Sequence, residues 1–231
     1  MHEKIRNIFS SYSIDISDDQ IEKFKIYYEF LVEYNKNVNL TAITNFDEVI
    51  VKHFIDSIMV LKYVDIGKSS LVDIGSGAGF PGIPLKIMRD DIDLSIVDSL
   101  EKRLVFINKL AEKLGITVDT YHKRAEDLDD CMRESFDFAT ARAVAPLNIL
   151  SELCIPYIKP GGKFIALKSK EAKEELIKAS CAIETLGGTV QENYDYKLGI
   201  YGARNIIVID KIRNTAPLYP RNSKKIKKNP L

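Results

Sequence analysis

The spacing of hydrophobic residues along the chain changes once, near Gly67. Before that point apolar residues recur every three or four positions, which is the spacing of one face of an amphipathic helix. Ser17 followed three residues later by Gln20 is the capping-box pattern of a helix start, and a second helix is expected to begin near Asp47. The first sixty-odd residues are therefore predicted to be helical.

Beyond Gly67, short apolar runs rich in β-branched residues alternate with helical stretches, which is the order of β-α-β units in a parallel sheet. Seven strands are expected near residues 70–75, 92–98, 116–121, 135–141, 162–168, 189–197 and 204–212. The clearest helices between them are expected at Glu101–Leu114, Pro146–Tyr157 and Glu171–Leu186. The pattern predicts an α/β fold around a central, mostly parallel sheet.

Charge is unevenly distributed along the chain, although the 33 basic residues balance the 33 acidic ones overall. The stretch from Lys211 to Leu231 contains no acidic residue and seven basic ones. Such a run either binds nucleic-acid phosphates without sequence selectivity or is a solvated, frayed end, and its few apolar residues make a packed structure doubtful. We divide the chain into a helical extension packed on the core (1–66), a main domain (67–213) and a basic tail (214–231).

Composition narrows the class of protein. The 45% hydrophobic and 29% charged residues are ordinary for a globular protein. Cys131, Cys154 and Cys181 are widely spaced and accompanied by only three histidines, so we expect neither a disulfide framework nor a metal site. Because no apolar run reaches the ~18 residues required to span a bilayer, we expect a cytoplasmic protein, and we take it to be a monomer.

A glycine-rich loop follows the first predicted strand. From Asp73 to Gly79 the sequence reads D-x-G-x-G-x-G, and glycines of this kind let the backbone turn sharply and approach a nucleotide closely. Together with Gly82 the same stretch also fits the G-x-G-x-x-G pattern of dinucleotide sites. The loop alone predicts a nucleotide-like cofactor without choosing between the two classes.

The residues around the loop favour S-adenosylmethionine (SAM). A dinucleotide site needs a helix that begins promptly and presents its amides to a pyrophosphate, and Pro81 and Pro84 argue against such a helix. SAM has no phosphate and carries a sulfonium cation, which suits the carboxylate of Asp73 ahead of the loop. Asp98, at the end of the second strand, is placed to accept hydrogen bonds from both ribose hydroxyls of either nucleotide.

Seven blocks of sequence, spread over nearly the whole chain, carry a resemblance to a known family. They are Asn39-Leu40-Thr41-Ala42-Ile43, His53-Phe54-Ile55-Asp56-Ser57, the run from Asp73 to Leu85, Asp98-Ser99 with Lys102-Arg103, Arg124-Ala125-Glu126, Arg142-Ala143 and Ala166-Leu167-Lys168. These blocks resemble the RsmG family, formerly called GidB, of small-subunit ribosomal RNA methyltransferases. The resemblance implies a Rossmann-like, class I methyltransferase fold that uses SAM to methylate N7 of one guanosine in 16S rRNA, within the small ribosomal subunit or an assembly intermediate.

The resemblance, with the loop and its acids, also assigns residues to the site. Cofactor contacts are expected from Asp73, Gly75, Gly77 and Phe80 at the loop, Asp98 and Ser99 at the ribose, Ala125 and Glu126 at the adenine, and Arg142 after the fourth strand. RNA contacts are expected from Lys168 and from the tail residues Arg221, Lys224 and Lys225.

The chemistry implied for guanine N7 needs no general base. N7 carries an in-plane lone pair and no proton, so the enzyme has only to align it with the sulfonium methyl and exclude water. His53 and Asp56 fall three residues apart on one face of a predicted helix and could form a hydrogen-bonded pair. Arg142 would be electrostatically unfavourable beside a cationic cofactor unless it meets a carboxylate or an RNA phosphate. We expect these three residues to position the reactants.

Two other functions compete with this interpretation. The G-x-G-x-x-G match raises a nicotinamide-dependent oxidoreductase, and a methyltransferase fold could also belong to a non-catalytic RNA-binding assembly factor. The segment after the fourth strand, Thr140 to Pro146, lacks the Asn/Asp-Pro-Pro-Tyr/Phe motif with which enzymes bind an exocyclic amine. Methylation of an exocyclic amine is therefore disfavoured.

Overall fold

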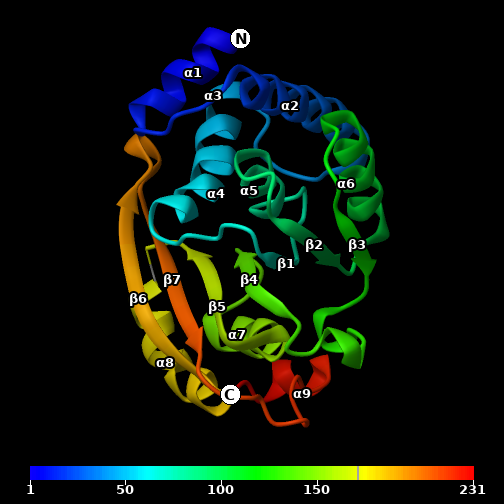
Figure 1. Cartoon of the computed structure of the whole chain (residues 1–231), viewed down its shortest axis with the longest axis vertical. Coiled ribbons are helices and arrows are strands. Elements are labelled where there is room, and N and C mark those ends of the chain that lie inside the picture. Colours follow the sequence, from blue (N-terminus) through cyan, green and yellow to red (C-terminus); the bar gives the residue numbers. More distant parts are fainter. Residues whose placement is uncertain (171) are drawn as a thin grey trace.

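A seven-stranded sheet runs through the centre of the computed structural model, which describes residues 1–170 and 172–231 (Figure 1). The strands are β1 (Ser70–Ile74), β2 (Asp93–Asp98), β3 (Asp119–His122), β4 (Phe136–Arg142), β5 (Ile158–Lys168), β6 (Gly188–Lys197) and β7 (Ala203–Lys211). Their order across the sheet is β3-β2-β1-β4-β5-β7-β6, and only the pairs that include β7 are antiparallel among the described strands. The predicted α/β class and all seven predicted strands are confirmed.

Helices cover both faces of the sheet, with α1 to α6 on one side and α7 to α9 on the other (Figure 1). They are α1 (His2–Ser11), α2 (Asp18–Val38), α3 (Phe46–Val49), α4 (Asp56–Ile58), α5 (Gly82–Met88), α6 (Glu101–Leu114), α7 (Leu147–Cys154), α8 (Ala172–Thr185) and α9 (Ser223–Lys228). A π-helical segment, Ile50–Ile55, joins α3 to α4, and a 3-10 turn, Met59–Lys62, follows α4.

The alternation of side chains along each strand gives the molecule two hydrophobic cores. On β1, Leu71 packs with the helices α1 to α6, whereas its neighbour Val72 packs with α7 and α8. Ile165 and Ala166 divide in the same way on β5. Because successive residues of a strand point to opposite faces, a run of consecutive apolar residues is what a sheet covered on both sides requires.

Most helix predictions are confirmed in their position. The Ser17 side chain and Gln20 form the predicted capping box at the start of α2, and α6 spans the predicted residues. The helix expected over Pro146–Tyr157 is wrong in its last turn, where a 3-10 turn replaces it because Pro156 has no N–H to continue α-helical bonding. The expected start of the last helix, Glu171, lies outside the described residues.

A row of aromatic rings joins the N-terminal helices to the loop after β1. The ring centroids of Phe24 and Phe54 lie 5.0 Å apart, those of Phe54 and Tyr27 4.9 Å, and those of Tyr27 and Phe80 5.3 Å. The Tyr27 hydroxyl donates to the carbonyl of Ala78 inside the loop, and burial raises the pKa of Tyr27 well above its usual value. The N-terminal helices therefore hold the glycine loop from behind.

The basic tail is folded, so the expectation that it lacks a packed structure is wrong. It ends in α9, whose Ile226 is only 2% exposed. The guanidinium of Arg221 binds the carboxylate of Glu152, which is buried on α7. The tail has few apolar residues to bury, and this ion pair between residues far apart in the chain holds it on the domain.

Candidate active site

A cavity of about 540 Å³ opens at the carboxyl ends of β1, β2 and β4. Its wall contains Ile74 to Ala78 and Phe80 after β1, Val97 to Ser99 after β2, Lys123 to Glu126 after β3, and Arg142 to Ala145 after β4. In an α/β sheet, ligands bind where the strand order reverses, which here is between β1 and β4. Its volume is in the ~300–1,000 Å³ range of small-molecule sites.

The glycine loop forms the floor of this cavity through left-handed backbone conformations. Gly75, Gly77 and Gly79 have φ angles of +72°, +63° and +97°. A Cβ on Gly75 would lie 2.9 Å from a methyl of Val144, whereas a Cβ on Gly77 would meet no atom within 4 Å. Gly77 therefore leaves open the space in which a ligand can approach the backbone.

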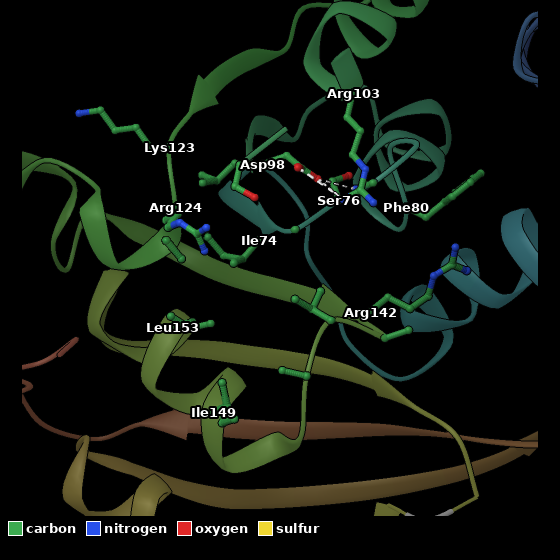
Figure 2. A pocket seen from close by; sticks show the side chains of 18 of the residues that line it. Ile74, Ser76, Phe80, Asp98, Arg103, Lys123, Arg124, Arg142, Ile149 and Leu153 are labelled. Carbon is green, nitrogen blue, oxygen red and sulfur yellow. Dashed lines mark hydrogen bonds and ion pairs between the residues drawn. The ribbon is translucent and has the colours of Figure 1, made fainter. Parts of the chain in front are cut away.

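Asp98 fixes the loop from the end of β2. One carboxylate oxygen accepts the Gly77 N–H at 3.1 Å and an Arg103 N–H at 3.2 Å, and the other accepts the Leu100 N–H at 2.9 Å. Figure 2 shows Arg103 reaching down to this carboxylate at the rim of the cavity. Asp98 is thus both a support of the loop and part of the cavity wall, at the place expected for the ribose.

Asp73 lies behind the loop and not on the cavity wall. It is fully buried, one carboxylate oxygen accepts the Gly82 N–H at 2.9 Å, and burial raises its pKa to about 6. Asp73 is therefore not part of the wall of this cavity, and the cofactor contact expected of it stays a prediction. The residue stabilises the junction between the loop and α5.

Pro81 and Pro84 do not delay the next helix, so the prediction that they argue against a prompt helix is wrong. α5 begins at Gly82, directly after Pro81. Its first amides are nevertheless occupied, because Gly82 N–H donates to Asp73, Ile83 N–H donates to the Gly79 carbonyl, and Pro84 has no N–H. Because the start of α5 offers no free amide to a pyrophosphate, these occupied amides disfavour a dinucleotide cofactor.

Arg142 is held at the junction of the cavity and the N-terminal helices. Its guanidinium donates to the Asp56 carboxylate and to the Lys52 carbonyl, both at 3.1 Å, and to Nδ1 of His53 at 3.2 Å. It also lies 4.8 Å from the centroid of the Phe80 ring (Figure 2). The expectation that Arg142 meets a carboxylate is confirmed. The predicted hydrogen bond between His53 and Asp56 is wrong, since Arg142 lies between them and binds both.

His53 is a neutral imidazole with both ring nitrogens engaged. A guanidinium can only donate, so Nδ1 accepts from Arg142, and Nε2 carries the hydrogen and donates to Oγ1 of Thr41 at 3.0 Å. Burial, together with the charge of Arg142, lowers the pKa of His53 to about 3. The ring stacks on Phe80, with centroids 4.5 Å apart.

Asp56 has two further partners that the sequence did not indicate. Its second oxygen accepts the Tyr196 hydroxyl at 2.7 Å and lies 3.7 Å from Nε of Arg204. Tyr196 and Arg204 belong to β6 and β7, about 140 residues away along the chain. No local pattern could have predicted contacts at that separation.

A second cavity, of about 560 Å³, lies on the other side of the segment after β4. It shares His53 and Arg142 to Ala145 with the first cavity. Its own wall adds charged side chains of both signs, namely Lys52, Asp56, Lys168, Glu175 and Arg204. The two cavities therefore adjoin one another at these residues.

The residues expected to contact RNA fall into two groups. Lys168 has a side chain only 6% exposed, with its ammonium bound to Glu175 at 2.7 Å and to the Ala145 carbonyl at 2.6 Å. Arg221 is likewise committed to Glu152. Both charges are paired within the protein, and the RNA contacts expected of these two residues stay predictions. Lys224 and Lys225 are exposed on α9.

The comparison with known proteins decides the family. Residues 20–201 match the family described as GidB, rRNA small subunit methyltransferase G. Ribosomal RNA small subunit methyltransferase G of Staphylococcus epidermidis is 50% identical over 226 residues, covering 96% of this chain and 95% of that one. The chain belongs to this family.

The rest of the comparison agrees with methyltransferase G membership. The protein of the same name from Listeria monocytogenes is 46% identical over 224 residues, covering 95% of this chain and 94% of that one. A methyltransferase structure from Pyrococcus furiosus superposes with a TM-score of 0.59 at 15% identity, covering 83% of this chain and 99% of that one. The protein is therefore an rRNA methyltransferase with the Rossmann-like, class I fold.

Two general features complete the description of this methyltransferase. Every helix in the described part of the chain is too short or too polar to cross a lipid bilayer. Across the same residues, side chains of the metal-ligating types do not gather in groups of three or more.

Proposed function

We propose that the protein transfers the methyl group of SAM to N7 of one guanosine in the 16S rRNA of the small ribosomal subunit. The observation that carries the proposal is the pair of cavities that share His53 and the segment from Arg142 to Ala145. A cofactor in the first cavity and an extruded base in the second would meet at the residues that the two cavities share. Enzymes that act on a base take it out of its stack and into a pocket of this kind.

The first cavity fits SAM in shape and polarity. Gly77 leaves room at the loop, and the buried hydroxyl of Ser76 in the cavity wall has no hydrogen-bond partner among the described residues. The carboxylate of Asp98 lies at the end of β2, where a nucleoside ribose would bind. When bound, SAM would supply the electrophilic methyl group, and the occupied amides of α5 favour it over a cofactor with a pyrophosphate.

The shared wall supports a reaction without a general base. The shared wall contains the imidazole of His53. Both ring nitrogens of His53 are hydrogen-bonded, and the pKa of the ring is about 3. An imidazole in that state neither abstracts nor donates a proton near neutral pH. Guanine N7 needs no deprotonation, so orientation of the base and exclusion of water are sufficient. Phe80 and Arg142, stacked beside His53, form a rigid surface for that purpose.

Tritiated methyl transfer from SAM to 30S subunits tests the proposal. We expect incorporation at one guanosine, which borohydride reduction and aniline cleavage would map as N7-methylguanosine. Asp98→Ala should abolish SAM binding in a calorimeter and incorporation together, because it removes the carboxylate that fixes Gly77. Absence of incorporation would favour an RNA-binding assembly factor, and a label resistant to aniline cleavage would contradict N7 as the acceptor.

A further inference from the structure

The C-terminal helix α9 forms part of the wall of the first cavity. Ser223, Ile226 and Lys227 are part of the cavity wall, together with residues of the glycine loop. The match to the methyltransferase G family ends at residue 201, so it does not include this helix. The sequence suggested only a basic tail that binds RNA or is frayed.

Buried polar contacts fix the position of α9. The Arg221 backbone N–H and Nε each lie 2.8 Å from one carboxylate oxygen of Glu152, and Nη2 lies 2.6 Å from the other. The Glu152 side chain is only 1% exposed on α7, so the carboxylate would be left uncompensated without the tail. Beyond α9, the Asn148 side-chain amide donates to the carbonyl of Leu231 at 3.2 Å. The tail is thus attached to α7 on both sides of α9.

The two sides of α9 differ in character. Ile226 is 2% exposed and is part of the wall of the first cavity, and the helix that carries it packs against α7. Ile149 and Leu153 of α7 line the same cavity and extend the apolar surface (Figure 2). Lys224 and Lys225, in contrast, are exposed and are not part of the wall.

An apolar stretch of cavity wall suits the flat face of a purine. The polar part of the wall includes Ser76 and Asp98, and a nucleoside ribose would bind at Asp98. Ala125 and Glu126, the residues expected beside the adenine, lie in a 3-10 turn that lines the cavity with Ile149 and Leu153. Small-molecule sites combine a largely apolar lining with a few polar groups that set the orientation.

We propose that α9 is the outer wall of the cofactor site and that Ile226 packs against the adenine of bound SAM. The proposal rests on the proposed use of SAM. It assigns a cofactor-binding role to a segment that its charge alone marks as an RNA tail. A substitution on the inner side of α9 would then weaken cofactor binding without altering the glycine loop.

Cysteine protection by S-adenosylhomocysteine, the by-product of methyl transfer from SAM, tests α9 as the wall of the site in the full-length chain. The thiol introduced by Lys227→Cys, which is exposed and on the cavity wall, should be alkylated at least fivefold more slowly when the site is saturated. The thiol introduced by Lys225→Cys, two residues earlier, exposed and not on the wall, should react at the same rate with and without the ligand. Peptide mass spectrometry separates both from the native, exposed Cys131 and Cys181. Equal rates at position 227 would overturn the proposal.

Calorimetry with SAM provides the second measurement. Ile226→Ala should weaken SAM binding about tenfold, which corresponds to about 1.4 kcal/mol of binding free energy. Lys224→Ala should bind SAM like the unaltered chain. If the unaltered chain binds no SAM, the proposed function fails and this proposal fails with it. If the unaltered chain binds SAM and Ile226→Ala binds it equally well, only the role of α9 is overturned.

Discussion

Gly77 and Gly115 form a natural pair for testing the glycine loop at the scale of single residues. Both have a φ angle of +63°, and a Cβ on either would meet no atom within 4 Å. Gly77 lines the first cavity, whereas Gly115 caps the end of α6. Gly77→Ala should weaken SAM binding at least tenfold in a calorimeter, because its methyl group would occupy space that the ligand needs.

Gly115→Ala is the matched control for this substitution. The left-handed conformation costs any L-residue about 1–2 kcal/mol, so both variants should lose a similar amount of stability in urea. Only the first should lose affinity for SAM. Equal SAM affinity in the two variants would show that the cofactor does not approach the loop at Gly77.

The raised pKa of Asp73 predicts a dependence of stability on pH. Burial raises the pKa from its usual 3.8 to about 6 in the folded protein, so between these values the folded state keeps a proton that the unfolded state has lost. The stabilising contribution is complete below pH 3.8 and is lost as the pH rises through about 6. The free energy of unfolding, relative to Asp73→Asn, should fall by roughly 2.4 kcal/mol from pH 4 to pH 7.

Asp137 supplies the control for this measurement. Burial opposes a lower pKa at Asp137, but hydrogen bonds from Ser70 and Lys159 outweigh it and hold the pKa below its usual value. Its contribution is therefore lost only as the pH falls below about 4. Unfolding in urea should give a constant difference between the unaltered chain and Asp137→Asn from pH 5 to pH 7. A constant difference for Asp73→Asn as well would contradict the assignment.

At the scale of secondary structure, local patterns predicted the elements but not their irregularities. The capping box of Ser17 and the apolar periodicity of α6 lie within one segment, so the sequence around them is sufficient. The π-helical segment Ile50–Ile55 is different. Two of its carbonyls, at Lys52 and His53, accept hydrogen bonds from Arg142, about 90 residues further along. A helix distorted by a tertiary contact has no local signature.

The same π-helical segment should depend on Arg142 for its stability. Arg142→Ala would leave the Asp56 carboxylate buried, with the hydroxyl of Tyr196 and the distant Arg204 as its remaining partners. Breaking a buried pair of this kind costs about 3–5 kcal/mol, which unfolding in urea would measure. Circular dichroism should show reduced helicity, and RNA methylation should fall.

A partly exposed pair on the sheet gives the comparison for Arg142. Lys163 and Asp210 join β5 to β7 at 2.5 Å, with side chains 28% and 33% exposed. Solvent screens such a pair, so Lys163→Ala should cost no more than ~1 kcal/mol. If Arg142→Ala and Lys163→Ala lost the same free energy of unfolding, burial of the Arg142 ion pair would not explain its contribution to stability.

For the whole molecule, the sequence predicted most residues of the first cavity but not the contacts between residues far apart in the chain. The loop, Asp98 and Arg142 follow strands, and strand ends meet at one edge of a parallel sheet. Arg221 pairs with Glu152, 69 residues before it, and that pair anchors the tail beside the first cavity. Neither residue carries a local signal of the other.

The balance of 33 basic and 33 acidic residues means that affinity for RNA must come from local surfaces, and the exposed side of α9 is one of them. Replacing both Lys224 and Lys225 by Ala should weaken binding to 30S subunits and flatten its salt dependence. Each phosphate that the protein no longer neutralises lowers the slope of log K against log salt by ~0.7 on single-stranded RNA, so two should lower it by ~1.4. Filter binding between about 50 and 200 mM KCl, where such contacts change the affinity steeply, would measure the slope.

A matched control removes two exposed charges elsewhere on the molecule. The paired replacement of Lys4 on α1 and Lys178 on α8 by Ala should leave the slope of log K against log salt unchanged. Calorimetry should also give the Lys224 and Lys225 variant an unaltered affinity for SAM, because the inward Ile226 remains. An unchanged slope in that variant would place the RNA elsewhere on the molecule. A helix whose outer residues govern RNA affinity and whose inner residue governs cofactor affinity would connect the two substrates through a single short segment.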